Sequence, residues 1–145
     1  MTAPDAHTPA GPVRVFTEEQ SWDALRSERL GRLVTSVGGR IDVVPVNYLA
    51  DAGRLLFRTA EGTKLVELSI ENRVVFEVDH INPGVSGWSV VVHGTARTLS
   101  TSAEIAEAEA LDLVSWVPTT KYNIVEIVPT EISGRELMFG DSPGA

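Results

Sequence analysis

Hydrophobic and polar residues alternate over several short stretches of this chain, with the two-residue period of half-buried β-strands. Alternation or valine-rich apolar runs predict six strands, at residues 32–37, 41–50, 54–59, 73–79, 87–99 and 122–133. Gly38 and Gly39 separate the first two strands, and residues 51–53 precede the third. Such short turns indicate antiparallel neighbours, so we expect the first three strands to form a meander.

Three short helices are expected beside these strands. The first and third begin at capping boxes, in which a threonine and a residue three places later satisfy each other's free amides. The second has apolar residues at helical spacing after a residue suited to the N-cap position. The predicted helices follow Thr17, Thr63 and Thr101, and the third runs through Val114.

The proportions of these elements indicate the fold class. Strands outnumber helices and are joined by short turns, which favours a closed or nearly closed antiparallel barrel over a doubly wound sheet. Pro129 predicts an edge or a bulge in the last strand. Residues 1–13 are rich in Pro, Ala and Gly and predict a disordered N-terminal tail, and residues 134–145 predict a C-terminal tail, which leaves one domain at 14–133.

The composition of the chain mainly excludes certain partners and certain kinds of site. The formal net charge of −8 opposes a broad basic surface, so neither nucleic acid nor an anionic membrane is an expected partner. The chain has no cysteine, which excludes disulfides, thiol catalysis and thiolate metal sites. It has neither a run of about 18 apolar residues nor a basic N-terminal region followed by an apolar one. A cytoplasmic protein is the simplest expectation.

The stretch FRTAEGTKL, residues 57–65, is the strongest candidate for binding chemistry. If it joins the end of a strand to the start of a helix, charged groups, hydroxyls and free helix amides could converge on one phosphate. The side chains that could do so are Arg58, Thr59, Thr63 and Lys64. The alternative is that the two cations are solvated charges beside a turn, paired with Glu61 or Glu67.

Other polar groups give weaker signals. Asp79 and His80 are adjacent, so they would point to opposite faces of a strand, which argues against a metal site. His93 lies within an apolar strand, where a hydrogen-bonded or interface histidine is the usual explanation. The sequence thus predicts no metal ligand set and identifies no catalytic side chain.

Taken together, several segments resemble the FMN-binding split barrels related to pyridoxamine 5'-phosphate oxidase. These segments occur in family order and with family-like spacing, and the last strand also fits. They are GRLVTSVGGRIDVVPVNYL (31–49), RLLFRTAEGTKLVEL (54–68), RVVFEVD (73–79) and GWSVVVHGTARTL (87–99). The resemblance implies a mainly β fold, a six-stranded antiparallel split β-barrel with short flanking helices, in which residues 14–133 form an FMN-binding domain.

The resemblance also implies roles for single residues. The cofactor-binding residues would be Val44, Pro45, Val46 and Asn47 along the flavin ring, Arg58, Thr59, Thr63 and Lys64 around the ribityl chain and phosphate, and Trp88 and Ser89 from the second subunit of a homodimer. Two of these have simpler alternatives. Pro45 lacks an N–H and also suits an ordinary edge strand, while Trp88 suits a core or dimer-interface aromatic.

The implied function is an FMN-dependent oxidoreductase that acts on a small-molecule substrate at the homodimer cleft. Because the flavin carries the electron chemistry, no catalytic side chain is required. True pyridoxamine 5'-phosphate oxidases are longer and hold substrate residues in a C-terminal segment, so vitamin B6 oxidation is not assigned. The alternatives are a non-catalytic flavin- or haem-binding protein and a reductase dependent on F420, whose polyglutamate tail needs a basic groove that Arg54 and Arg73 could extend.

Overall fold

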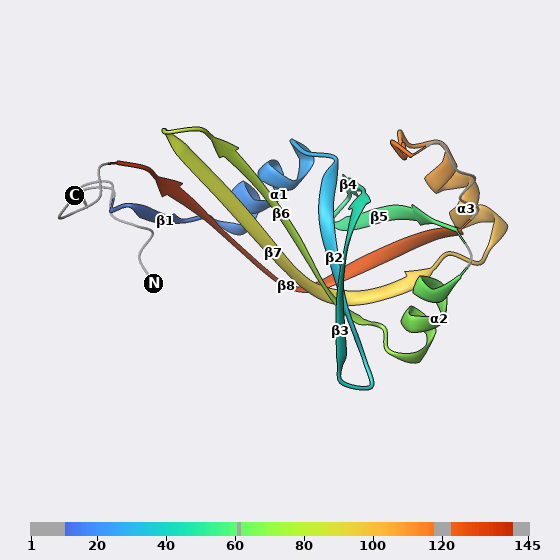
Figure 1. Ribbon diagram of the computed structural model, residues 1–145. Coiled ribbons are helices and arrows are strands. Elements are labelled where there is room, and N and C mark those ends of the chain that lie inside the picture. Colours follow the sequence, from blue (N-terminus) through green and yellow to red (C-terminus); the bar gives the residue numbers. More distant parts are fainter. Residues whose placement is uncertain (1–10, 61, 118–122, 141–145) are drawn as a thin grey trace.

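The structure is a computed structural model that describes residues 11–60, 62–117 and 123–140 of the chain. Within these ranges, three short helices flank one curled, eight-stranded antiparallel sheet (Figure 1). The strands are β1 (Val13–Val15), β2 (Leu30–Val37), β3 (Arg40–Asn47), β4 (Leu49–Asp51), β5 (Arg54–Thr59), β6 (Arg73–Asn82), β7 (Ser86–Thr98) and β8 (Asn123–Met138). The helices are α1 (Glu18–Arg26), α2 (Thr63–Ile70) and α3 (Ser102–Glu109).

The sheet curls without closing. Its strands run in the order β3-β2-β6-β7-β8-β5-β4, and β1 pairs with the far end of β8. β3 and β4 therefore form the two ends, and in the ranges that the structure describes β3 pairs with β2 alone. This arrangement confirms the predicted mainly β split barrel with short flanking helices, although the sheet has eight strands rather than six.

The expected strand at 41–50 is divided at Tyr48, so the predicted meander is present only in part: the turn at 51–53 joins residues 49–51 to the third strand, but residues 40–47 do not pair with that strand. The backbone N–H of Tyr48 donates to the Arg29 carbonyl at 3.0 Å, and its buried hydroxyl donates to the Leu25 carbonyl at 2.6 Å. These bonds tie the chain to the end of α1, so the residues after Tyr48 leave β2 and pair as β4 with β5. β5 pairs on its other side with β8 rather than with β3.

The last strand continues past the expected domain boundary at 133, as far as Met138. Residues 134–138 are strand because they pair with β7 on one side and with β1 on the other. Their assignment to a C-terminal tail is therefore wrong. Of the predicted tails, residues 1–10 and 141–145 lie outside the described residues.

Short turns and one bulge lie where the sequence predicts them. Gly38 and Gly39 have φ of 58° and 81°, which allows the two-residue turn between β2 and β3. In the β7–β8 pair the register shifts so that His93 lies opposite Glu131 while Gly94 lies opposite Pro129. Thr130 is the extra residue of this bulge, and its hydroxyl donates to the His93 carbonyl at 3.1 Å.

Two apolar clusters hold the sheet and the helices together. The larger lies between one face of the sheet and the helices α1 and α2, and the smaller lies under α3, where Leu56 and Ile124 pack with Ala108 and Leu113. β5 contributes to both clusters, which explains why its apolar residues are continuous rather than alternating. The sequence predicted that this helix runs through Val114, but α3 ends at Glu109. The chain beyond it folds back so that Leu113 enters this cluster.

All three helices begin close to where they were expected, and both capping boxes are present. In the first, Thr17 and Gln20 exchange hydrogen bonds of 2.8 and 3.1 Å. None of the helices in the described part of the chain is both long enough and apolar enough to cross a membrane.

Gly31 of β2 gives a direct test of the packing. A Cβ at this position would overlap the buried ring of Phe76 and lie 3.1 Å from the Glu77 carbonyl. We therefore expect Gly31→Ala to lower the free energy of unfolding by about 1–3 kcal/mol in urea denaturation, because the core cannot absorb the extra methyl group. Gly140→Ala is the control, since a Cβ there meets nothing within 4 Å. An equal effect of the two substitutions would contradict the described packing.

Candidate functional site

A pocket of about 310 Å³ opens in the split of the barrel, between the edge strand β3 and the end of β5. The first turn of α2 and the segment that follows α3 complete its wall. Seven of the ten cofactor residues implied by the resemblance line this pocket, namely Val44, Pro45, Val46, Asn47, Arg58, Thr59 and Lys64. Four separate parts of the chain therefore meet around one space.

The β3 side of the pocket is mainly apolar. Val44 and Val46 are half-buried and pack against the larger core cluster. Pro45 is exposed on the edge strand, opposite Arg32 of β2, which confirms that it lies at an edge. Because proline has no N–H, this position could not donate to a further strand even if one approached.

Asn47 lies at the end of β3, and both polar atoms of its side-chain amide form hydrogen bonds. Its Nδ2 donates to the Arg29 carbonyl at 3.1 Å, and its Oδ1 accepts from the backbone N–H of Trp116 at 2.8 Å. Asn47 therefore attaches the segment after α3 to β3.

Lys64 lies in a closed triangle of polar groups with Thr35 and Glu67. Its Nζ donates to Glu67 Oε2 at 2.8 Å and to the Thr35 hydroxyl at 3.2 Å, and that hydroxyl donates to the same carboxylate oxygen at 3.1 Å. The hydrogen bond from Lys64 is the main reason why the pKa of Glu67 is lowered. The predicted alternative, in which Lys64 pairs with Glu67, is thus present in the structure.

Arg58 is held by α3 and by the segment after it. Its Nη1 and Nη2 donate to the two carboxylate oxygens of Glu109 at 2.9 and 2.7 Å, and its Nε donates to the Leu113 carbonyl at 3.0 Å. The bidentate bond lowers the pKa of Glu109 and raises that of Arg58. Glu61, one of the partners suggested for the two cations, lies outside the described residues.

These pairs neutralise the two cations that were predicted to bind a phosphate. Each of the two cations contacts one carboxylate, so the four charged groups balance. The physical reason lies in the helices. Glu67 stands one turn after Lys64 on α2, and the packing of α3 on β5 brings Glu109 to Arg58.

The start of α2 differs from the prediction by one residue. Gly62 rather than Thr63 occupies the N-cap position, with a φ of 146° that glycine adopts readily, and the helix begins at Thr63. No side chain in the described residues caps this end, and its first turn contains no acidic residue. Backbone N–H groups at such an end attract anions.

Trp88 and Ser89 do not line the pocket of a single chain. The ring of Trp88 packs against the larger core cluster, in agreement with the core alternative. Ser89 lies in register between Asp79 and Arg135. Whether either residue contributes to the site of a second subunit stays a prediction.

Sequence reasoning missed the segment after α3. Val114, Trp116 and Val117 line the pocket and are 57%, 63% and 56% exposed. They were missed because the alanine- and glutamate-rich pattern was extended through Val114, which placed part of this segment in a helix. The available signal was Trp116, which follows Val114 and Ser115 and precedes Val117.

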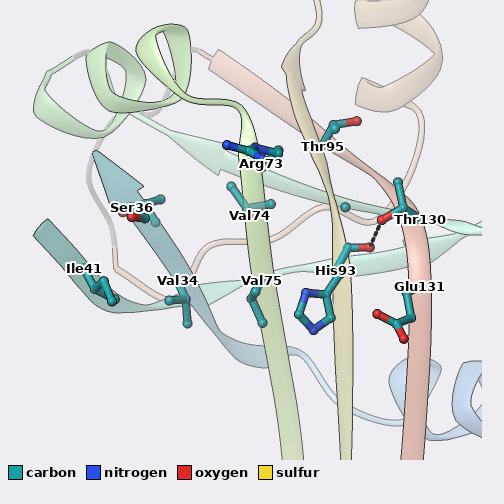
Figure 2. Close-up of a pocket in the computed structure, with 12 residues that line it drawn as sticks. Val34, Ser36, Ile41, Arg73, Val74, Val75, His93, Thr95, Thr130 and Glu131 are labelled. Carbon is teal, nitrogen blue, oxygen red and sulfur yellow. Dashed lines mark hydrogen bonds between the residues drawn. The ribbon is translucent and has the colours of Figure 1, made fainter. Parts of the chain in front are cut away.

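A larger cavity of about 550 Å³ lies elsewhere, lined mainly by side chains that point away from the larger core cluster, on what we call the outer face of the sheet (Figure 2). Val34, Ile41 and Val75 supply apolar surface, and His93 lies beside Glu131 on the neighbouring strand. Nine of the ten implied cofactor residues have described side chains, all but Thr63, and none of these nine lines this cavity. In the described ranges, no three His, Cys, Asp or Glu side chains are grouped so that they could hold a metal ion.

The chain is similar to known proteins over most of its length. The family model described as pyridoxamine 5'-phosphate oxidase matches residues 17–136. An uncharacterised protein of Mycobacterium tuberculosis is 32% identical over 135 residues, which cover 89% of this chain and 88% of that protein.

Two crystal structures are similar over most of the chain. A candidate pyridoxamine 5'-phosphate oxidase of Corynebacterium glutamicum is 40% identical with a TM-score of 0.80, covering 90% of this chain and 98% of its own. The FAD-binding protein of Mycobacterium smegmatis is 42% identical with a TM-score of 0.75, covering 86% of this chain and 98% of its own.

A pair of carboxylates on the outer face predicts a pH effect on stability. Arg32 Nη1 lies 3.2 Å from Glu77 and 3.4 Å from Asp79. Burial, followed by a hydrogen bond with Asp79, raises the pKa of Glu77 from 4.5 to about 7. The folded state therefore holds this proton more tightly than the unfolded chain, so the contribution is complete below pH 4.5 and is lost as the pH rises through about 7.

We expect Glu77→Gln to reduce the fall in unfolding free energy between about pH 5 and about pH 8, measured by urea denaturation, because the variant has no proton to lose. Glu131→Gln removes a carboxylate from the same face and serves as the control. A wild-type pH slope that persists in Glu77→Gln would contradict this assignment.

Proposed function

Because the chain belongs to the pyridoxamine 5'-phosphate oxidase family, we propose that it binds the flavin nucleotide FMN in the pocket between β3 and β5 and acts as a flavin-dependent oxidoreductase on a small-molecule substrate. The observation that carries the proposal is the convergence of seven implied cofactor residues on one pocket. The similarity to an FAD-binding protein at 42% identity supports a flavin.

The walls of the pocket suit a flavin ring, which is a flat apolar plate with a polar edge. Val44, Val46 and Phe57 supply apolar surface, and the edge of β3 supplies backbone groups that pair with no other strand in the described chain. A volume of about 310 Å³ is near the lower end of the range for ligand pockets, so one chain would enclose only part of a nucleotide.

The phosphate would lie at the first turn of α2. Lys64 uses two of its three N–H donors for Glu67 and Thr35, which leaves one for a ligand. The backbone amides at this end have no side-chain cap among the described residues. A bound flavin would supply the electron-transfer chemistry, while these residues would bind and orient it.

We also propose a homodimer through the outer face of the sheet. Ile41 and Val43 are 68% and 63% exposed there, although both belong to a strand. Arg32 and Glu77 on the same face provide charges of both signs, which could pair across the axis of a self-complementary twofold interface. Pro45 lies on this face of β3, opposite Arg32, and also lines the pocket, so a second copy seated on the face would lie beside the pocket.

The F420 alternative gains no specific support, because the two further cations suggested for its basic groove, Arg54 and Arg73, do not line the pocket and each contacts a carboxylate. Arg54 donates to Glu126 at 2.8 Å, and Arg73 contacts Glu71 at 3.0 Å. FMN therefore remains the proposed cofactor, and F420, haem and FAD are the other ligands to be tested.

Titration of the purified protein with FMN, FAD, F420 and haem, followed by absorption spectra, tests the cofactor. Saturable FMN binding is the expected result, and tight binding of F420 or haem without flavin affinity would overturn the proposal. Reduction of the bound flavin by NAD(P)H and reoxidation by candidate acceptors then separates an oxidoreductase from a carrier, which would bind without turnover.

Lys64→Ala tests the phosphate position. We expect it to weaken FMN by roughly 10- to 100-fold and riboflavin far less, because riboflavin lacks the phosphate that the ammonium would contact. Arg26→Ala, which removes an exposed cation from α1, is the control. Equal losses for FMN and riboflavin would argue against this role of Lys64.

Val43→Asp tests the interface. The side chain is exposed in the single chain, so the fold should survive, whereas a charge within the proposed interface should shift the protein from dimer to monomer in sedimentation experiments. Ile70→Asp is the control, because Ile70, at the end of α2, is 67% exposed. A wild-type monomer, or a dimer that is unaffected by Val43→Asp, would refute the proposed face.

A further inference from the structure

The guanidinium of Arg58 is oriented entirely by α3 and the residues after it. Within the part of the chain that the structure describes, all three of its hydrogen bonds go to Glu109 or to the Leu113 carbonyl, and its side chain is only 20% exposed. A planar fork that binds a carboxylate through both Nη atoms is held in a fixed direction. A ligand phosphate at Arg58 would therefore have to compete with a carboxylate that is already in place.

Among the described residues, the bond to the Leu113 carbonyl is one of two hydrogen bonds that attach residues 113–117, which we call the wall segment, to the strands beside the pocket. The first attachment joins it to β5 through Arg58, and the second joins it to β3 through the bond from the Trp116 N–H to Asn47. The wall segment thus bridges the two strands that border the split. Leu113, which is 6% exposed, anchors its first residue in the cluster under α3.

Between and beyond these attachments the wall segment leaves apolar surface uncovered beside the pocket. Trp116 is 63% exposed, and the valines on either side of Ser115 and Trp116 are also more than half exposed. An indole has the large flat apolar area that packs well against another planar ring. An exposed indole beside a pocket is more typical of a ligand-binding surface than of a side chain that stabilises the fold.

From these contacts we infer that Arg58 is a positioning residue, which together with Glu109 fastens the wall segment and so places Trp116 against the flavin ring. The phosphate is left to Lys64 and the first turn of α2. This inference rests on the proposed flavin site, and it gives Arg58 a role other than the phosphate contact implied by the resemblance.

The test compares FMN with riboflavin, which share the ring but not the phosphate. Both ligands are titrated into the wild type, Arg58→Gln, Glu109→Gln, the double variant and Trp116→Leu, with tryptophan quenching and the visible flavin spectrum as readouts. Arg58→Gln should weaken both ligands by the same factor, roughly tenfold, because positioning acts on the ring. Glu109→Gln should do the same, and the double variant should be no weaker than either single variant, because the two side chains act as a unit.

Trp116→Leu should weaken both ligands and alter the spectrum of the bound flavin, and Arg58→Gln should add little in that background. The matched control is Arg97→Gln. Arg97 forms a similar pair with Glu104 on the same helix at 2.7 and 3.3 Å, but neither residue lines the pocket. It should leave both affinities unchanged, and thermal unfolding should show every variant folded at the titration temperature.

The contrary results are distinct. A loss in Arg58→Gln that is confined to FMN would place the guanidinium on the phosphate and overturn the inference, while leaving the flavin site intact. Tighter FMN binding by Glu109→Gln would also overturn it, since the carboxylate would then be a competitor of the ligand. Equal losses in Arg97→Gln and Arg58→Gln would assign the effect to the stability of α3. If the wild type binds neither flavin, the proposed function fails and the inference fails with it.

Discussion

The unpaired edge of β3 is the constraint on which the rest of the site depends. An edge strand leaves one row of backbone groups without a strand partner, and Pro45 removes one of the N–H donors that a further strand would need. The sheet therefore stays open between β3 and β5, and the pocket forms in that opening. Other parts of the chain can reach the same space only because the barrel is not closed there.

The cations beside this opening are each paired with a nearby carboxylate. The chain has a formal net charge of −8, and each of the two pocket cations has its own carboxylate, Glu67 for Lys64 and Glu109 for Arg58. Such pairing leaves neither half-buried cation without a counter-charge. It also weakens the long-range attraction of the pocket for anions, so recognition would depend on short-range hydrogen bonds and on the shape of the walls.

The parts of the fold that sequence reasoning predicted well are those with a local cause. Alternation gave the main strands, paired glycines gave the first hairpin, and Pro129 gave the bulge in β8. The break at Tyr48 was not predicted, because it depends on bonds to Leu25 and Arg29 that only the folded chain brings close. β1 was missed because three residues are too few to show a period.

The same distinction applies to the site. The partner of Lys64 lies three positions away on one helix and could be named as an alternative, whereas the partner of Arg58 is 51 positions away. The pairing of Arg58 with Glu109 requires α3 to dock on β5, which no local pattern reveals. The wall segment was missed for a related reason, since its place beside the pocket is set by bonds to Asn47 and Arg58 and not by its own sequence.

The bulge at Thr130 has a consequence for the whole of β8. Ile127 and Ile132 both face the core although they are an odd number of positions apart, which a regular strand forbids. The extra residue resets the alternation, so the two halves of this strand keep separate inside and outside patterns. Without Thr130 the two isoleucines would be four positions apart, which a regular strand places on one face, so a chain that lost this residue could lose the bulge and still keep both isoleucines in the core.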